Sequence, residues 1–164
     1  MTVLIASASK HGATQEIAEE IGRVLAQAGI ATDVRRIEEV HALDTYQALV
    51  LGSAVYMGRW MDSAAHFIAD HGAAMIGRPV WLFSSGPIGE PPHPDEAHAV
   101  HVEELVAASG AREHRLFAGR LDKHLLSFGE RAVMVAVRAP EGDFRDWALV
   151  ADWASEVAEA LSDA

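Results

Sequence analysis

The chain has 164 residues, half of them hydrophobic, and no cysteine, so we expect one domain over residues 1–164 and exclude disulfides, thiol catalysis and Cys-bound metal centres. Its formal net charge of −11, from 13 basic and 24 acidic residues, disfavours nucleic acid as a partner. No apolar run approaches the ~20 residues of a membrane helix, and the first residues lack a signal-peptide layout, so we expect a cytoplasmic protein whose membrane contact, if any, is peripheral.

The first predicted strand leads through a polar turn into a helix. Residues 2–7 are an apolar run, Ser9–Thr14 are small or polar and include a glycine, and residues 13–28 have helical apolar spacing. A strand, tight turn and helix N-terminus can form an anion site from outward-pointing backbone N–H groups, to which Ser9 and Thr14 would add hydroxyl donors. The same residues could equally form an ordinary turn whose hydroxyls cap the helix.

This turn lacks two familiar phosphate-binding signatures. It contains neither the G-x-G-x-x-G of dinucleotide-binding domains nor the G-x-x-x-x-G-K-[ST] of nucleotide triphosphatases, because Lys10 precedes Gly12 instead of following it. A phosphate held by hydroxyls and backbone amides, without a required cation, is typical of a flavin mononucleotide (FMN) site.

The rest of the chain continues to alternate strand and helix patterns. The remaining predicted strands are residues 31–37, 48–52, 79–84 and 112–118, and the remaining predicted helices are residues 61–75, 95–109 and 145–162, with a loop over 86–94. Such alternation predicts a parallel sheet covered by helices on both faces. Five strands of this size favour an α/β three-layer sandwich of the flavodoxin-like type, with strand order 2-1-3-4-5.

In that order, ligands bind at the carboxyl ends of the strands around the switch point. The three most unusual turns of the chain, Ser7–Thr14, Gly52–Trp60 and Ser84–Gly89, follow strands one, three and four. Each is small, polar and glycine-containing, so that backbone could approach a flat ligand closely. A response regulator would instead need carboxylates at these ends, where the chain has Ala-Ser and Gly-Ser.

These motifs resemble the flavodoxin-domain family, and in particular its branch of menaquinone-dependent protoporphyrinogen IX dehydrogenases. A simple flavodoxin carries T-x-T-G-x-T in its first loop, whereas Ser9–Thr14 reads S-K-H-G-A-T, with a basic second residue and no hydroxyl at the third. The resemblance to the dehydrogenase branch extends to Gly52–Trp60, Phe117–Leu121 and Asp146–Trp147. It covers nearly the whole chain.

The resemblance implies an FMN-binding oxidoreductase in which the flavin carries the chemistry, with no catalytic side chain and no metal. It implies three cofactor-binding segments: Ser9, Lys10, His11, Gly12, Ala13 and Thr14 at the phosphate; Ser53, Ala54, Val55, Tyr56, Met57 and Gly58 in a second loop; and Ser84, Ser85, Gly86, Pro87, Ile88 and Gly89 in a third. The implied partners are a quinone, a porphyrinogen or a redox protein. A one-electron carrier and a non-enzymatic flavin-binding domain remain alternatives.

A variable segment at residues 122–143 distinguishes these alternatives, because a dehydrogenase needs a wall that holds its substrate against the flavin. The segment is shorter and less basic than in the dehydrogenase branch. Its run Ala132–Val137 favours a strand by its valines, whereas the resemblance favours a helix beside the flavin, which we expect. The expected wall residues are Leu125, Leu126, Phe128, Val133 and Val137, with Arg120, Arg131 and Arg138 supplying charge for an anionic partner.

For several aromatic and histidine residues the sequence allows two interpretations, a ligand contact or a structural role. Tyr56 and Trp60 could contact the flavin or simply pack their loop, and we favour flavin contact. Trp81 is expected in the core, and Trp147 and Trp153 on the buried stripe of the last helix. The group His93, His98, His101 and Glu104 has partial metal-ligand spacing, but a solvated surface is the stronger interpretation.

Overall fold

The computed structural model describes residues 1–86, 100–136 and 141–163. Its main sheet contains five parallel strands, β1 (Thr2–Ala8), β2 (Ala31–Arg36), β3 (Ala48–Tyr56), β5 (Val80–Gly86) and β6 (Glu113–Ala118). They lie in the order β2-β1-β3-β5-β6, which is the predicted 2-1-3-4-5 order when the parallel strands are counted along the chain. The flavodoxin-like fold class is therefore confirmed.

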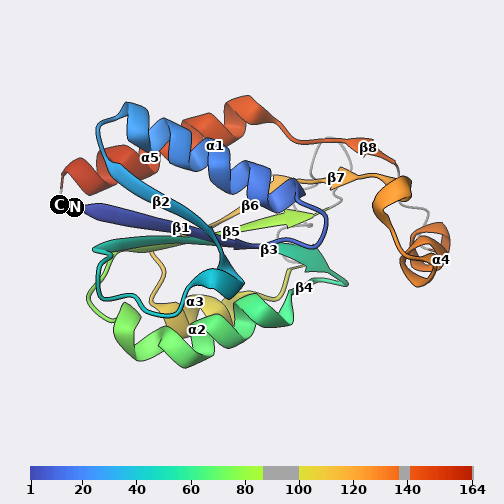
Figure 1. Cartoon of the computed structure of the whole chain (residues 1–164), viewed down its shortest axis with the longest axis horizontal. Coiled ribbons are helices and arrows are strands. Elements are labelled where there is room, and N and C mark those ends of the chain that lie inside the picture. The colour runs from blue at the N-terminus through green and yellow to red at the C-terminus, as the bar shows by residue number, and fades with distance from the viewer. Residues whose placement is uncertain (87–99, 137–140, 164) are drawn as a thin grey trace.

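Helices cover both faces of this sheet (Figure 1). One face carries α1 (Ala13–Gln27) and α5 (Trp147–Ser162), and the other carries α2 (Asp62–Met75) and α3 (Glu103–Ser109), while the short 3-10 helix η1 (Ile37–Glu39) follows β2.

Alternation of side chains along the buried strands divides the core into two clusters. Phe83 and Trp153 belong to the cluster under α1 and α5, whereas Leu82 and Phe67 belong to the cluster under α2 and α3. Trp81 is in the core, as expected. Gly52 lets β3 lie against the ring of Phe83, because a Cβ at Gly52 would overlap that ring.

The segment expected as a loop over Gly52–Trp60 is largely β-structure. β3 continues to Tyr56, and a two-residue turn at Met57 and Gly58 leads into β4 (Arg59–Trp60), which pairs antiparallel with β3. Both turn residues have positive φ, 50° and 75°, as in the primed turns that suit tight hairpins. The expected end of this strand at Gly52 was wrong because neighbouring strands continue the pairing to Ala54.

Two helix expectations also need correction. α3 begins at Glu103 and Val100–Val102 are not helical, so the helix expected from Asp95 is too long; residues 95–99 lie outside the described residues. Trp147 is 40% exposed and not part of the buried stripe, unlike Trp153, because it is the first residue of α5.

The variable segment forms a small subdomain beyond the carboxyl ends of the strands (Figure 1). The strands β7 (Arg120–Leu121) and β8 (Gly142–Asp143) pair antiparallel and enclose the 3-10 helix η3 (Lys123–Leu125) and the helix α4 (Phe128–Ala136). The helical interpretation is thus confirmed for residues 132–136, and Val137 lies outside the described residues. Among the described residues, no helix is long and apolar enough to cross a membrane.

Candidate functional site

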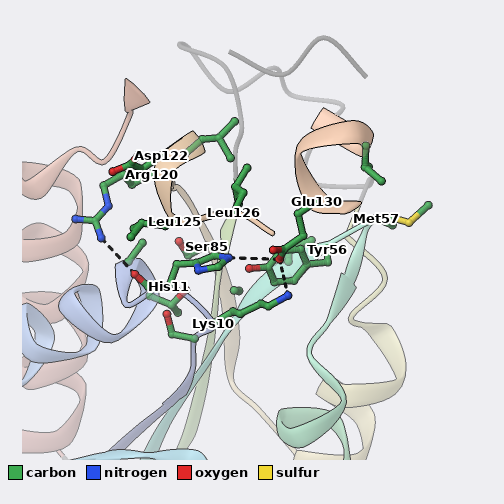
Figure 2. Close-up of a pocket in the computed structure, with 18 of the residues that line it drawn as sticks. Lys10, His11, Tyr56, Met57, Ser85, Arg120, Asp122, Leu125, Leu126 and Glu130 are labelled. Carbon is green, nitrogen blue, oxygen red and sulfur yellow. Dashed lines mark hydrogen bonds and ion pairs between the residues drawn. The ribbon is translucent and has the colours of Figure 1, made fainter. Parts of the chain in front are cut away.

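A cavity of about 570 Å³ lies between the turn after β1 and the segment η3–α4 (Figure 2). Its volume is in the range of ligand pockets, ~300–1,000 Å³. The lining residues are Ser9, Lys10, His11, Ala13, Thr14, Ala54, Val55, Tyr56, Met57, Ser85, Gly86, Arg120, Leu121, Asp122, Leu125, Leu126, Gly129, Glu130 and Val133. The three predicted segments therefore meet at one cavity, and a fourth wall comes from residues after β6.

The phosphate loop, residues 9–14, has the backbone geometry of an anion site. Gly12 is the N-cap of α1 in the left-handed region, with φ 86°, and no side chain caps the helix. Ser9 Oγ instead accepts the N–H of Gly12 at 3.0 Å, which stabilises the turn. The first N–H groups of α1 are left for a ligand, and the buried Thr14 lines the cavity beside them. These residues fit a phosphate.

Glu130 of α4 faces the basic residues of the phosphate loop (Figure 2). Its Oε1 lies 2.5 Å from Lys10 Nζ and 3.3 Å from His11 Nε2. The hydrogen bond from Lys10, with further bonds from Ser127, lowers the pKa of Glu130 to about 2. The sequence analysis did not select Glu130. The sequence pattern that could have identified it is a capping box, Ser127-x-x-Glu130. In the structure the Ser127 N–H donates to the Glu130 carboxylate and the Glu130 N–H donates to Ser127 Oγ.

The second segment contributes only part of its predicted residues to the cavity. Ala54, Val55, Tyr56 and Met57 line it, and burial raises the pKa of the Tyr56 hydroxyl. Ser53 does not, because its buried hydroxyl accepts the N–H of Met61 and donates to the Ala54 carbonyl.

Gly58 does not line the cavity either. It serves the hairpin turn, and its carbonyl accepts the N–H of His101 at 2.8 Å.

The third segment also divides into lining and structural residues. Ser85 and Gly86 line the cavity, whereas Pro87, Ile88 and Gly89 lie outside the described residues.

Ser84 is buried away from the cavity. Its hydroxyl accepts a hydrogen bond from Trp60 Nε1 and lies 2.7 Å from His114 Nε2. Trp60 therefore packs in the core instead of contacting a ligand. Burial lowers the pKa of His114, which favours the neutral imidazole, and an unprotonated Nε2 can accept a hydrogen bond from the Ser84 hydroxyl.

The wall opposite the phosphate loop is mainly apolar. Leu125, Leu126 and Val133 line the cavity as expected, whereas Phe128 is 91% exposed and does not. Arg131 donates to the Lys123 carbonyl and does not line the cavity, and Val137 and Arg138 lie outside the described residues.

The predicted histidine group gives no metal site in the described part of the chain. His101 and Glu104 are exposed, and His93 and His98 lie outside the described residues. The side chains of Asp122, His124 and Glu141 do converge within 4.8 Å of one another, but this group is largely exposed. Glu141 there also pairs with Lys123 Nζ at 3.3 Å.

A doubly wound sheet with a phosphate-type turn and a cavity at its switch point defines a nucleotide-cofactor-binding α/β protein. The chain belongs to the flavodoxin-domain family, whose model matches residues 4–147. Flavodoxin-domain proteins bind FMN, the cofactor expected from the sequence. No curated protein sequence matches the chain significantly.

Solved flavodoxin structures share the fold. The chain is 18% identical to a flavodoxin of Streptococcus pneumonia, with a TM-score of 0.65 and 99% of each chain covered. It is 16% identical to oxidised Flavodoxin 1 of Bacillus cereus, with a TM-score of 0.64, 97% of this chain and 98% of that chain covered. At these identities the likeness concerns the fold alone.

Proposed function

We propose that this protein is an FMN-dependent oxidoreductase, acting as a single domain in the cytoplasm. The observation that most directly supports this proposal is a single cavity, bounded on one side by a helix N-terminus without a side-chain cap and on the other by an apolar wall. The phosphate loop would hold the FMN phosphate, and the lining residues of the second and third segments would hold the isoalloxazine ring. The FMN supplies the redox chemistry, and the protein supplies binding, orientation and electrostatics.

The reaction we propose is a dehydrogenation related to that of menaquinone-dependent protoporphyrinogen IX dehydrogenases. Electrons from a porphyrinogen-like donor would pass through the cofactor to a quinone. The segment η3–α4 supports this proposal, because Leu125, Leu126 and Val133 build a wall that a simple electron carrier does not need. This wall would exclude water and hold an apolar substrate beside the ring.

A flavodoxin-type electron carrier is the second candidate. It is supported by the shared fold and by the exposure of Met57, 91%, at the rim of the cavity, where a redox partner could dock. A carrier would use the exposed rim and no substrate, whereas a dehydrogenase would use the interior of the cavity.

An anaerobic redox titration of FMN-loaded protein, followed by mixing with a quinone or a porphyrinogen, tests these functions. The dehydrogenase proposal predicts two-electron reduction and rapid exchange of electrons with one of these small molecules. Separate one-electron steps, with exchange only through another redox protein, would establish the carrier instead. A bound flavin that exchanges electrons with neither would leave a non-enzymatic flavin-binding domain.

A further inference from the structure

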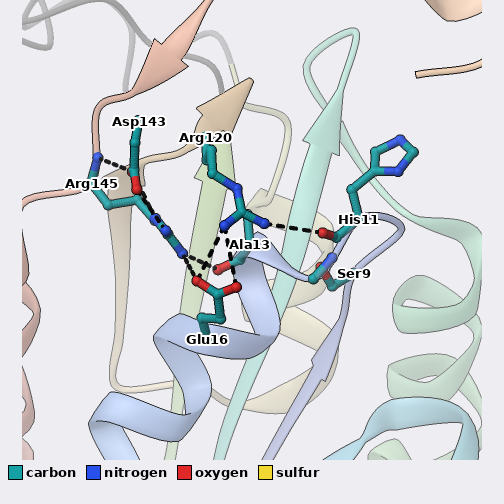
Figure 3. A network of polar contacts seen from close by, with 8 residues as sticks. Ser9, His11, Ala13, Glu16, Arg120, Asp143 and Arg145 are labelled. Carbon is teal, nitrogen blue, oxygen red and sulfur yellow. Dashed lines mark hydrogen bonds and ion pairs between the residues drawn. The ribbon is translucent and has the colours of Figure 1, made fainter. Parts of the chain in front are cut away.

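Four charged side chains from distant parts of the chain meet beside the phosphate loop (Figure 3). Glu16 comes from the first turn of α1, Arg120 from β7, Asp143 from β8, and Arg145 from the residues just before α5. The group contains two cations and two anions. Their distances show that the two cations are held very differently.

Arg145 is fully engaged with protein acceptors. Its side chain is only 4% exposed. It donates to both carboxylate oxygens of Asp143, at 2.8 and 2.7 Å, and to Glu16 Oε2 at 2.5 Å. These hydrogen bonds are the main reason that the pKa values of Asp143 and Glu16 are lowered. Arg145 therefore keeps both carboxylates ionised and occupied.

Arg120 is held only loosely. Its Nη1 lies 3.3 and 3.5 Å from the two carboxylate oxygens of Glu16, and its Nη2 lies 3.4 Å from the His11 carbonyl. Charge-assisted hydrogen bonds are usually about 2.7–2.9 Å long, so all three contacts are weak. Lys10, the other Lys or Arg described in the cavity lining, is instead bonded to Glu130 at 2.5 Å. Of these two cations, Arg120 is therefore the one whose N–H groups can still donate strong hydrogen bonds to a ligand.

We propose that Arg120 is the residue by which the pocket selects a phosphorylated flavin, and that Arg145 positions it by occupying Glu16. The proposal rests on the FMN site proposed above. The Arg120 contact with the His11 carbonyl places its guanidinium beside the phosphate loop, and its side chain lines the cavity. A guanidinium binds phosphate through two parallel N–H···O bonds, and riboflavin, which ends in a neutral hydroxyl, has no anionic group to accept them.

Titration of FMN and riboflavin, followed by quenching of flavin fluorescence, tests the role of Arg120. Arg120→Gln should raise the Kd for FMN about ten- to a hundred-fold, the effect of losing a hydrogen bond to a charged group, and leave riboflavin unchanged. The Kd of Arg120→Lys for FMN should lie between those of the wild type and Arg120→Gln. The control Arg23→Gln changes the net charge equally on the exposed face of α1 and should change neither Kd.

Glu16→Gln separates ligand binding from a structural role. If Glu16 competes with the phosphate for Arg120, removing its charge should tighten FMN binding several-fold and leave riboflavin unchanged. If the four residues only brace the loop, the same change should weaken both flavins. Equal losses of both flavins in Arg120→Gln, or weaker FMN binding in Glu16→Gln, would overturn the proposal.

A wild-type protein that binds neither flavin would refute the proposed FMN site, and inorganic phosphate then tests Arg120 separately. Phosphate should raise the melting temperature above that in chloride of equal ionic strength. This rise should disappear in Arg120→Gln and persist in Arg120→Lys. An equal rise in wild type and Arg120→Gln would overturn the role of Arg120.

Discussion

Thr14 is the phosphate-loop side chain whose burial and placement most directly predict a ligand contact. It is 1% exposed, lies in the first turn of α1 and lines the cavity. Its neighbour Ser9 has the same chemistry but uses its hydroxyl to stabilise the turn. The two hydroxyls of this loop therefore have different expected roles, although the sequence predicted both as ligand donors.

Replacing Thr14 with Val removes the hydroxyl and nearly preserves the side-chain volume. The loss of a hydrogen bond to a charged phosphate costs about 1.5–3 kcal/mol, so the Kd for FMN should rise roughly ten- to a hundred-fold and that for riboflavin should change little. Thr45→Val, at an exposed position outside the cavity lining, should alter neither. Equal losses for both flavins would remove Thr14 from the phosphate site.

Serine side chains show how far residue-level prediction extends. Ser9, Ser53, Ser84 and Ser85 all follow or end strands at the correct edge of the sheet, and the sequence assigned all four to the cofactor. Ser53 and Ser84 instead hydrogen-bond to protein groups and are buried. Sequence position fixes the strand end at which a residue lies, but not its partner. The partners of Ser84 come from β4 and β6, and Ser53 accepts the N–H of Met61, the residue just after β4.

At the level of elements, α4 is held to the phosphate loop mainly by charge. Phe128, Arg131, Val133 and Val135 are exposed on this helix. Glu130 provides an ion pair with Lys10 and a 3.3 Å contact with His11. Among its described side chains, the helix is therefore held over the cavity by one carboxylate more than by a buried face.

Glu130→Gln should loosen α4 without unfolding the sheet. Exposed ion pairs contribute about 0.2–1 kcal/mol, so amide hydrogen exchange in α4 should become faster at neutral pH, by up to about five-fold. Exchange in β1 and β3 should not change. Glu104→Gln, on the exposed surface of α3, is the matched control. Unchanged exchange in α4 would show that other contacts hold the helix.

The pH dependence of this contact follows from the same carboxylate. The pKa of Glu130 is lowered from 4.5 to about 2, so its stabilising contribution is complete above pH ~4.5 and is lost as the pH falls towards 2. The carboxyl resonance of Glu130 in an NMR titration should report this low pKa. A midpoint near 4.5 would contradict the ion pair with Lys10.

For the whole molecule, the sequence predicted the sheet order and the edge that carries the cavity, because buried parallel strands are recognisable as apolar runs. At the fourth wall it predicted Leu125, Leu126 and Val133 but missed Glu130, and it assigned Arg120 to an anionic partner instead of the cofactor. Arg120 and Glu130 reach the cavity only because β7 pairs with β8 and returns the chain across the strand ends. No local pattern encodes that tertiary pairing, although the capping box at Ser127 and Glu130 did mark the start of α4.

Replacing residues 128–136 with a Gly/Ser connection tests whether α4 makes the molecule a dehydrogenase. Because most described side chains of α4 are exposed, the melting temperature and FMN binding should be largely retained, whereas turnover with a quinone or porphyrinogen should be abolished. Joint loss of stability and FMN would identify α4 as a packing element. Unchanged turnover in a folded variant would favour the electron carrier.

Titration of the wild-type protein with FMN and riboflavin most directly tests the central claim, that a phosphate loop and a flavin pocket form one site at the carboxyl edge of the sheet. The account predicts one FMN per chain, with visible quenching of flavin fluorescence, and an affinity for FMN at least ten-fold above that for riboflavin. Binding of neither flavin, or equal affinity for both, would contradict it.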